Sequence, residues 1–420
     1  MLVTQLSKPA ARSADGGHQD ALDGLRAIAI LLVIFLHVGD ETAQTSSNAL
    51  PWRIIESGGV GVSVFFALSG LLLYRPWARA VLGGGGNRGG LPGPDTRVYL
   101  WRRVLRIVPA YWVMLIVGLF VFNPGHVGSV RTWFEMLTLT QNYDPAPWWK
   151  GVGPDGLGPM WSLSAEASFY LVLPLIAAGL RRFALRAGED LDGRAKRLLY
   201  GLGTIALVTF ACTVAMRLWA DYDTMFYYEH LLPRWMIDFL AGMALTVLAE
   251  WARRRPRGPA ARWVTTVGGM LGSCWLAAFC ALVVVSTPVG LSPAAVLPDL
   301  PVPQNAAQYL VSAILYLVIA VALVAPVALS PSHPLTLAVL GNRVVRWLGL
   351  ISYGLFLWHQ LVIFGWYKVT GRPIWNHDFW LVLPVVLVVG IAISTVSFYV
   401  IEKPALRLRG LVKGASARRA

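Results

Sequence analysis

The most restrictive feature of this 420-residue chain is a series of long apolar stretches that recur along almost its whole length. A helix needs about 20 apolar residues to cross the hydrocarbon core of a bilayer, and in a bilayer a helix satisfies its own backbone hydrogen bonds. The sequence therefore predicts an all-α fold, a polytopic membrane bundle of about ten transmembrane helices. The ten candidate spans are 22–39, 58–74, 104–122, 162–180, 198–219, 234–250, 264–287, 306–330, 347–367 and 379–401.

Composition excludes the soluble classes. Only 14% of the residues are charged and 56% are hydrophobic, whereas soluble globular chains carry about 25% charged residues. A soluble enzyme and a disordered chain are both ruled out. The three cysteines, Cys212, Cys274 and Cys280, all lie in apolar stretches, so neither a disulfide framework nor a metal site is indicated. We expect no bound metal and no bound cofactor.

The charge pattern predicts the topology. The net charge is +14, which in a soluble chain would suggest nucleic acid. Here most of the lysines and arginines fall in alternate loops, as expected of cytoplasmic loops in a multi-pass cell-membrane protein. These loops are 75–106, 181–197, 253–262 and 403–419. We therefore expect both termini in the cytoplasm, membrane lipids as neighbours, and no nucleic-acid partner.

The same pattern divides the chain into three parts. Residues 1–20 form a cytoplasmic tail, 21–405 a membrane domain, and 406–420 a basic cytoplasmic tail. Within the membrane domain, the Gly/Pro-rich residues 83–94 predict a flexible cytoplasmic linker. Residues 123–160 form the longest outer loop, and their aromatic residues favour an interfacial or re-entrant segment.

Ionisable residues inside spans are costly and are often functional. The first span contains Arg26 and His37. In a helix, residues eleven apart lie about 16 Å apart along the axis and on nearly the same face. Arg26 would lie near the cytoplasmic side and His37 in the outer half. A histidine can serve as a general base, although a structural hydrogen-bonding role explains a single membrane histidine equally well.

The start of the third span carries Arg103 and Arg106, which share a helix face because they are three residues apart. Two guanidinium groups at the cytoplasmic interface suit phosphates, such as those of a coenzyme A ester. The alternative is a simple positive-inside anchor that binds lipid headgroups.

Two further polar positions stand out. Glu166 opens the fourth span, where a carboxylate could orient a histidine or bind a sugar hydroxyl. The alternative is helix-end chemistry, with Ser164 as the N-cap and Glu166 in the first turn. His359 lies near the middle of the ninth span, and a structural role there is as reasonable as a functional one.

Six segments together resemble the acyltransferase-3 family of integral-membrane bacterial O-acyltransferases. They occur in the family's order over about residues 20–405, and no one of them is decisive alone. The segments are LDGLRAIAILLVIFLHV (22–38), GVGVSVFFALSGLLLYR (59–75), RRVLRIVPAYW (102–112), WSLSAEASFYLVLPL (161–175), LGLISYGLFLWH (348–359) and FYVIEKP (398–404).

The resemblance implies transfer of an acyl group, acetyl or another short acyl, from cytoplasmic acyl-CoA to a hydroxyl, commonly on a sugar. His37 and Glu166 match the family's catalytic positions, with Glu166 or a backbone group fixing the tautomer of His37. Donor-binding positions match Arg26, Arg103 and Arg106. Residues expected to contact the acceptor or support catalysis are Ser69, Tyr170, Tyr353 and His359.

The resemblance leaves several points open. Relatives often carry a second acidic residue after the glutamate, where this chain has Ala167, and a different acceptor is therefore an open alternative. Acceptors consistent with the family are a cell-envelope glycan and a glycosylated metabolite such as a macrolide. Direct transfer and a covalent acyl-histidine intermediate both fit. A transporter of a small polar or lipid-linked substrate is the competing class, but it predicts an internal hydropathy repeat, and none is evident.

Overall fold

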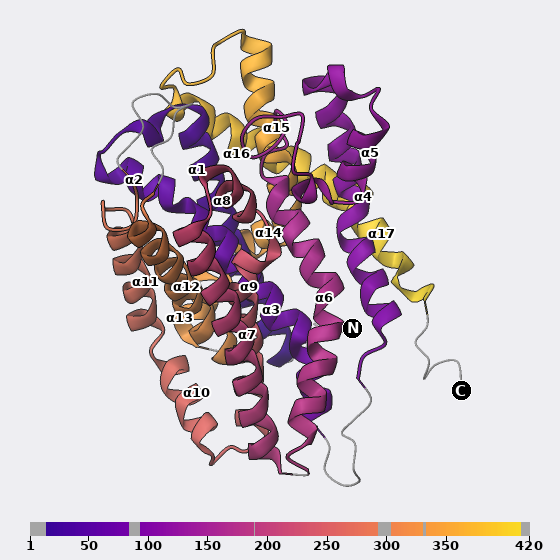
Figure 1. Ribbon diagram of the computed structural model, residues 1–420, viewed down its shortest axis with the longest axis vertical. Coiled ribbons are helices and arrows are strands. Elements are labelled where there is room, and N and C mark those ends of the chain that lie inside the picture. The colour runs from indigo at the N-terminus through magenta and orange to yellow at the C-terminus, as the bar shows by residue number, and fades with distance from the viewer. Residues whose placement is uncertain (1–13, 84–92, 189, 293–303, 331–332, 413–420) are drawn as a thin grey trace, which may run out of the picture.

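The computed structural model describes residues 14–83, 93–188, 190–292, 304–330 and 333–412. Within these residues the regular elements are all helical, as the sequence predicts, and none is a strand. The α-helices are α1 Ala14–Glu41, α2 Leu50–Glu56, α3 Val60–Leu82, α4 Thr96–Phe122, α5 Val130–Leu137, α6 Met160–Leu185, α7 Leu191–Trp219, α8 Tyr222–Tyr228, α9 Leu232–Arg254, α10 Pro259–Gly269, α11 Leu271–Val285, α12 Ala306–Leu329, α13 Pro334–Val339, α14 Arg343–Leu350, α15 Ser352–Thr370, α16 Phe379–Ser397 and α17 Lys403–Arg407 (Figure 1).

Eight helical runs among the described residues are long and apolar enough to cross a membrane. Two of the predicted spans are not straight helices. The span predicted at 264–287 is the pair α10 and α11, bent by 70°, and the span predicted at 347–367 is the pair α14 and α15, also bent by 70°. The first bend follows Gly268 and Gly269, as expected where glycines weaken a helix. Ten spans result if each bent pair crosses once.

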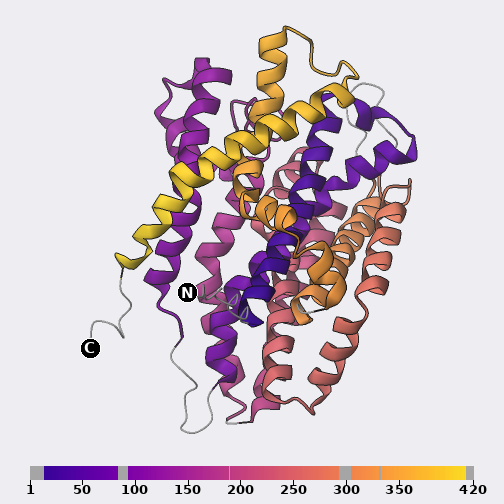
Figure 2. The same cartoon turned by 180° about the vertical axis from the view of Figure 1, so that it is seen from behind.

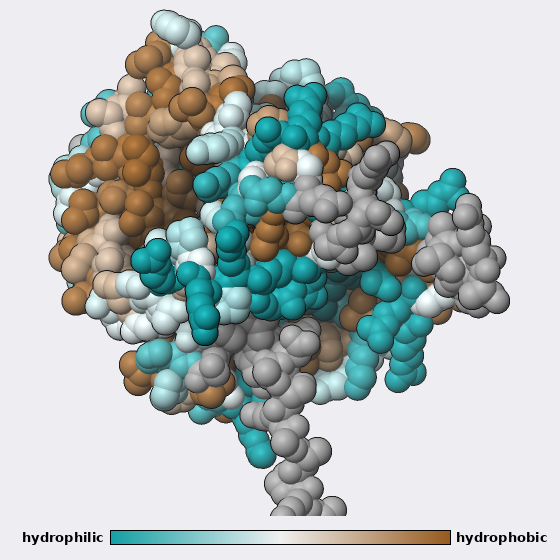
Figure 3. All heavy atoms as spheres, turned by 90° about the horizontal axis from the view of Figure 1, so that it is seen from below, coloured by the Kyte–Doolittle hydropathy of each residue, from teal (hydrophilic) through white to brown (hydrophobic). Residues whose placement is uncertain are grey.

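The polar end of the bundle is formed by short turns rich in arginine. It holds the turn between α6 and α7 and the turn between α9 and α10, at the bottom of Figure 1, and the start of α4 lies in the lower half of the same view. Seen from below, hydrophilic side chains gather over the middle of this face, and an apolar flank lies beside them (Figure 3). We call this face the basic end.

Side-chain caps fix where two helices start at the basic end. Asp95 Oδ1 accepts hydrogen bonds from the backbone N–H groups of Arg97 at 2.9 Å and Val98 at 3.4 Å, so that α4 begins at Thr96. Asp190 caps α7 in the same way. Most of the predicted 83–94 linker lies outside the described residues.

Helices α3 and α9 pack backbone to backbone. A Cβ on Gly70 would lie 2.0 Å from the carbonyl oxygen of Phe239, and a Cβ on Gly242 would lie 1.9 Å from that of Ala67. Small residues of this kind let two membrane helices approach backbone to backbone. Phe239 then stacks between two rings, with centroid distances of 4.5 Å to Phe66 and 3.9 Å to Phe169 of α6.

The C-terminal run crosses the bundle and ends against α4 (Figure 2). After α16 the chain forms one π-helical segment, Phe398–Glu402, and continues into α17. Trp101 Nε1 of α4 donates a hydrogen bond to the carbonyl oxygen of Leu408 at 3.1 Å. The described part of the predicted 406–420 tail is therefore packed on the membrane domain.

Candidate active site

A cavity of about 570 Å³ lies within the bundle, between α1, α3, α4, α6, the α14–α15 pair and the C-terminal run. Most of its wall is apolar. Its polar lining combines arginines, two carboxylates, three serines and two tyrosines: Asp23, Arg26, Ser69, Arg102, Arg103, Arg106, Ser162, Glu166, Tyr170, Ser352, Tyr353 and Arg409. We call it the arginine cavity.

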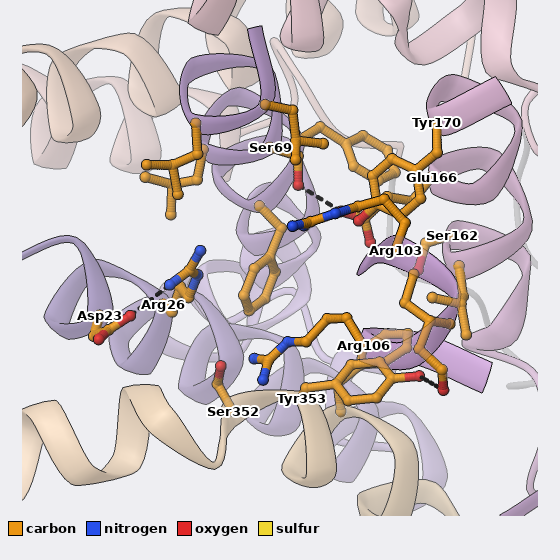
Figure 4. Close-up of a pocket in the computed structure, with 18 of the residues that line it drawn as sticks. Asp23, Arg26, Ser69, Arg103, Arg106, Ser162, Glu166, Tyr170, Ser352 and Tyr353 are labelled. Carbon is orange, nitrogen blue, oxygen red and sulfur yellow. Dashed lines mark hydrogen bonds and ion pairs between the residues drawn. The ribbon is translucent and has the colours of Figure 1, made fainter. Parts of the chain in front are cut away.

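The three arginines singled out in the sequence converge on this space. Figure 4 shows the guanidinium of Arg26 entering from α1 on one side and those of Arg103 and Arg106 from α4 on the other. The spacing of Arg103 and Arg106 therefore does place both on one lining face. Several guanidinium groups around one cavity make an anion site.

The partners of these arginines differ. Arg26 Nη1 lies 2.5 Å from Asp23 Oδ1, one turn earlier in α1. Arg106 Nη1 lies 3.6 Å from Glu402 Oε2, and Glu402 is only 1% exposed. Arg103 Nε is buried and has no hydrogen-bond partner among the described residues. The buried Nε of Arg103 is therefore an unsatisfied donor in a side chain that lines the cavity.

Glu166 is held by α3 rather than by a histidine. Ser69 Oγ donates a hydrogen bond to Glu166 Oε1 at 2.5 Å (Figure 4). Gly70, the next residue, lies at the tight contact of α3 with α9. The packing of these two helices therefore also sets the position of Ser69. The sequence allowed either Glu166 or a backbone group to fix the tautomer of His37. Within the described residues no hydrogen bond joins Glu166 to His37, so Glu166 does not take that role.

The helix-end interpretation of Glu166 is also wrong. Helix α6 begins at Met160, after Pro159, so Glu166 lies in its second turn and not its first. Ser164 is not an N-cap: its Oγ donates to the carbonyl oxygen of Leu139 at 2.5 Å and ties α6 to the loop before it. Residues 160–163 already belong to the helix, so it starts about one turn earlier than the Ser–Glu pattern suggests.

His37 faces His359. His37 Nδ1 lies 3.0 Å from His359 Nε2, and the ring centroids are 5.0 Å apart. Neither ring lines the arginine cavity, but Val33 and Phe356, about one turn earlier in α1 and α15, both do. The histidine pair therefore lies one turn beyond the wall of the cavity. Arg26 lines the cavity and His37 does not, so the two residues of α1 do not share one pocket.

The pair has a defined direction of hydrogen bonding. His359 Nδ1 lies 3.0 Å from the carbonyl oxygen of Leu355 and 2.8 Å from that of Phe356. A carbonyl only accepts, which assigns the proton of neutral His359 to Nδ1 and makes its Nε2 an acceptor. His37 Nδ1 must then donate, which leaves Nε2 of His37 with a free lone pair.

Tyr353 supports α4 instead of pointing its hydroxyl into the cavity. Its hydroxyl donates to the carbonyl oxygen of Ile107 at 2.8 Å. Its ring lies under the guanidinium of Arg106, with the Cζ atom 5.8 Å from the ring centroid. Tyr170 lines the cavity beside Glu166.

Sequence reasoning missed Arg102, Arg409 and Glu402. Arg102 and Arg409 line the cavity, but both were attributed to cytoplasmic basic segments because neighbouring residues are also basic. Glu402 ends the last span and is buried behind Arg106. A lone acidic residue between an apolar run and a lysine was a usable signal, because burial of a carboxylate requires a partner.

Comparison with known proteins now identifies the family. The family model described as "Acyltransferase domain", for the acyltransferase-3 family, matches residues 19–399. YrhL of Bacillus subtilis, provisionally named a peptidoglycan O-acetyltransferase, is 28% identical over 93% of this chain and 55% of its own length. Nodulation protein 10 of Rhizobium leguminosarum is 23% identical over 94% of this chain and 95% of its own length.

A third relative is the acyltransferase MdmB of Streptomyces mycarofaciens, 31% identical over 40% of this chain and 41% of its own. The chain spans about half the length of YrhL and of the peptidoglycan O-acetyltransferase OatA of Listeria monocytogenes. No solved structure matches significantly. Since the family model covers most of the sequence, the chain belongs to the acyltransferase-3 family.

Proposed function

We propose that this chain is a membrane-bound O-acyltransferase that moves a short acyl group from cytoplasmic acyl-CoA to a hydroxyl of a carbohydrate or glycosylated metabolite. The observation that carries the proposal is the convergence of Arg26, Arg103 and Arg106 on one cavity. The catalytic unit is the membrane domain, 21–405, together with Arg409 of the segment that follows it.

The donor site follows from charge and shape. Coenzyme A carries a pyrophosphate and a further phosphate, and planar guanidinium groups bind phosphate oxygens in pairs. Arg103, whose Nε is buried without a partner among the described residues, would bind such a phosphate. The apolar wall, which includes Phe65, Leu72 and Phe356, suits the pantetheine arm.

The orientation comes from the positive-inside rule. The arginine cavity lies among the basic segments at the start of α4 and the end of the C-terminal run. Such segments face the cytoplasm, where acyl-CoA is found. We infer that the basic end is cytoplasmic, with both termini on that side.

His37 supplies the base. A thioester is already activated, so the protein mainly positions it and removes the proton of the attacking hydroxyl. The hydroxyl oxygen attacks the thioester carbonyl carbon while its proton passes to His37 Nε2. The carbon–sulfur bond then breaks, and the thiolate takes that proton and leaves as coenzyme A. His359 keeps Nε2 of His37 free and stabilises the imidazolium that forms.

The names of the relatives support the proposed class of acceptor. Two of them carry names that specify peptidoglycan O-acetyl transfer, and MdmB is named an acyltransferase. A hydroxyl on a glycan or on a glycosylated metabolite fits both sets of names. Glu166 and Tyr170, which lie side by side in the cavity wall, supply polar contacts for such a substrate.

Two measurements test the proposal. Purified chain in nanodiscs should bind coenzyme A and should release free coenzyme A from acetyl-CoA when an acceptor is present. Mass spectrometry of envelope glycans and culture extracts from a deletion strain should show the loss of an acylated species. A chain that binds no coenzyme A, with unchanged glycans and metabolites in the deletion strain, would contradict it.

A further inference from the structure

A second cavity, of about 470 Å³, lies at the basic end between α3, α9, α10 and α12. We call it the lateral cavity. Its wall combines apolar side chains, among them Leu71, Leu72, Val264 and Leu329, with the charged residues Arg75, Glu250 and Arg253. It is distinct from the arginine cavity, with which it shares Leu72. An amphipathic lining of this kind suits a ligand with one polar and one apolar end.

The positive charges around Glu250 outnumber the negative ones. Glu250 is 3% exposed, and its Oε1 lies 2.7 Å from Arg79 Nε and 3.5 Å from Arg75 Nε. Its Oε2 also accepts a hydrogen bond from Arg253 Nε at 3.2 Å. One carboxylate is thus shared by three guanidinium groups, whose side chains are 31%, 42% and 57% exposed. The excess positive charge calls for an anionic ligand.

The lateral cavity also lies beside an exposed tryptophan. Trp263 of α10 precedes the lining residue Val264 and is 42% exposed. Exposed tryptophans of membrane helices gather at the membrane–water interface. The basic ends of such bundles face the leaflet that is rich in anionic lipid, and basic pockets between helices there bind lipid headgroups.

We propose that the lateral cavity binds an anionic phospholipid. The phosphate contacts Arg75 and Arg253, and the first part of an acyl chain lies along Leu71 and Leu329. A soluble phosphate would leave the apolar wall without a partner, and a zwitterionic lipid would leave the excess positive charge uncompensated. The inference is independent of the acyl transfer proposed above.

Native mass spectrometry of the full chain tests this. The delipidated protein is titrated with palmitoyl-oleoyl phosphatidylglycerol, with the matching phosphatidylcholine, and with phosphatidylglycerol in competition with glycerol phosphate or inorganic phosphate. We expect the wild type to retain phosphatidylglycerol in preference to phosphatidylcholine, and the soluble phosphates to compete poorly because they lack the acyl chain. Displacement by glycerol phosphate at equal concentration would instead identify a site for a soluble phosphate.

Three variants separate the cavity from general surface charge. Arg75→Gln with Arg253→Gln should weaken phosphatidylglycerol binding by about tenfold or more, while Arg79 still pairs with Glu250. Ala249→Phe fills the cavity without changing the charge and should also abolish retention. Arg254→Gln removes one exposed charge next to Arg253 but outside the lining, and should bind as the wild type does.

Two further results would overturn the proposal. One is wild-type binding by both the double variant and Ala249→Phe, which would place the lipid elsewhere. The other is a loss in Arg254→Gln as large as that in the double variant, which would show that only overall charge matters. Coenzyme A binding, measured on the same samples, reports on the arginine cavity and keeps the two proposals separate.

Discussion

His37 Nδ1 lies 3.0 Å from His359 Nε2 and thereby joins α1 to α15 across 322 residues of sequence. Each ring is the other's hydrogen-bond partner, so the two histidines form one hydrogen-bonded pair. A substitution at either position changes the environment of the other, so neither serves as a neutral control for the other.

His37→Ala should abolish transfer while leaving acyl-CoA binding intact, because the arginines and not His37 line the donor cavity. General-base catalysis contributes about 10²–10⁴-fold, and a loss of kcat in that range is expected. His230→Ala is the matched control, since His230 Nδ1 also bonds to a backbone carbonyl, that of Phe226. Turnover above about a tenth of wild type in His37→Ala would place the base elsewhere.

His359 is proposed as a positioning residue, and two substitutions distinguish that role from a packing role. His359→Gln keeps an oxygen that accepts from His37 Nδ1, whereas His359→Leu removes the acceptor. Both should lower the melting temperature, but His359→Leu should reduce kcat much more at unchanged KM for acyl-CoA. Equal kcat values in the two variants would show that His359 only fills space.

Arg103→Ala and Arg106→Ala should weaken acyl-CoA binding. Loss of a charge-assisted hydrogen bond costs about 1.5–3 kcal/mol, or about 10- to 100-fold in affinity. Arg97→Ala is the control, because Arg97 is exposed on the same helix and does not line the cavity. Titration of coenzyme A into nanodisc samples provides the measurement. Unchanged coenzyme A affinity in both variants would show that the two arginines serve only as a positive-inside anchor.

Reporter fusions test the topology. Fusions after Gly193 and after Lys413 should both report a cytoplasmic location, because the surrounding loops carry most of the basic residues. A fusion after Lys413 that is active outside the cell would contradict both the ten-span count and the orientation of the arginine cavity.

Gly242→Ala should destabilise the bundle. The added Cβ would lie 1.9 Å from the carbonyl oxygen of Ala67, so α3 and α9 must separate. Overpacking of this kind costs about 1–3 kcal/mol. Gly179→Ala, in α6, is the control because a Cβ there meets nothing within 4 Å. The melting temperature in detergent should fall for Gly242→Ala alone, and equal values would show that the contact is not tight.

The sequence predicted the features that depend on neighbouring residues, namely the membrane spans and the helix face shared by two arginines. The length of the apolar stretches was enough for the membrane spans, and a spacing of three residues was enough to place Arg103 and Arg106 on one lining face. The bends before Leu271 and Ser352 were not predictable, because an apolar run of the right length looks the same whether the helix is straight or bent by 70°.

Side-chain contacts between helices that are far apart in the chain could not be predicted from the sequence. Nothing local to the first span indicates that His37 meets His359, and the Ser–Glu pattern after Trp161 pointed to a cap that does not form. Glu166 instead meets Ser69, 97 residues earlier. Such contacts depend on how helices pack, here on the glycines that bring α3 against α9.

Leu72 of α3 lines both the arginine cavity and the lateral cavity. If both proposed occupants contact Leu72, binding in one cavity can change binding in the other. Thermodynamic linkage makes any such coupling reciprocal: a lipid that changes donor affinity by some factor has its own affinity changed by the same factor. If the lateral cavity holds lipid as proposed, donor affinity measured in bilayers of different anionic-lipid content would report any such coupling.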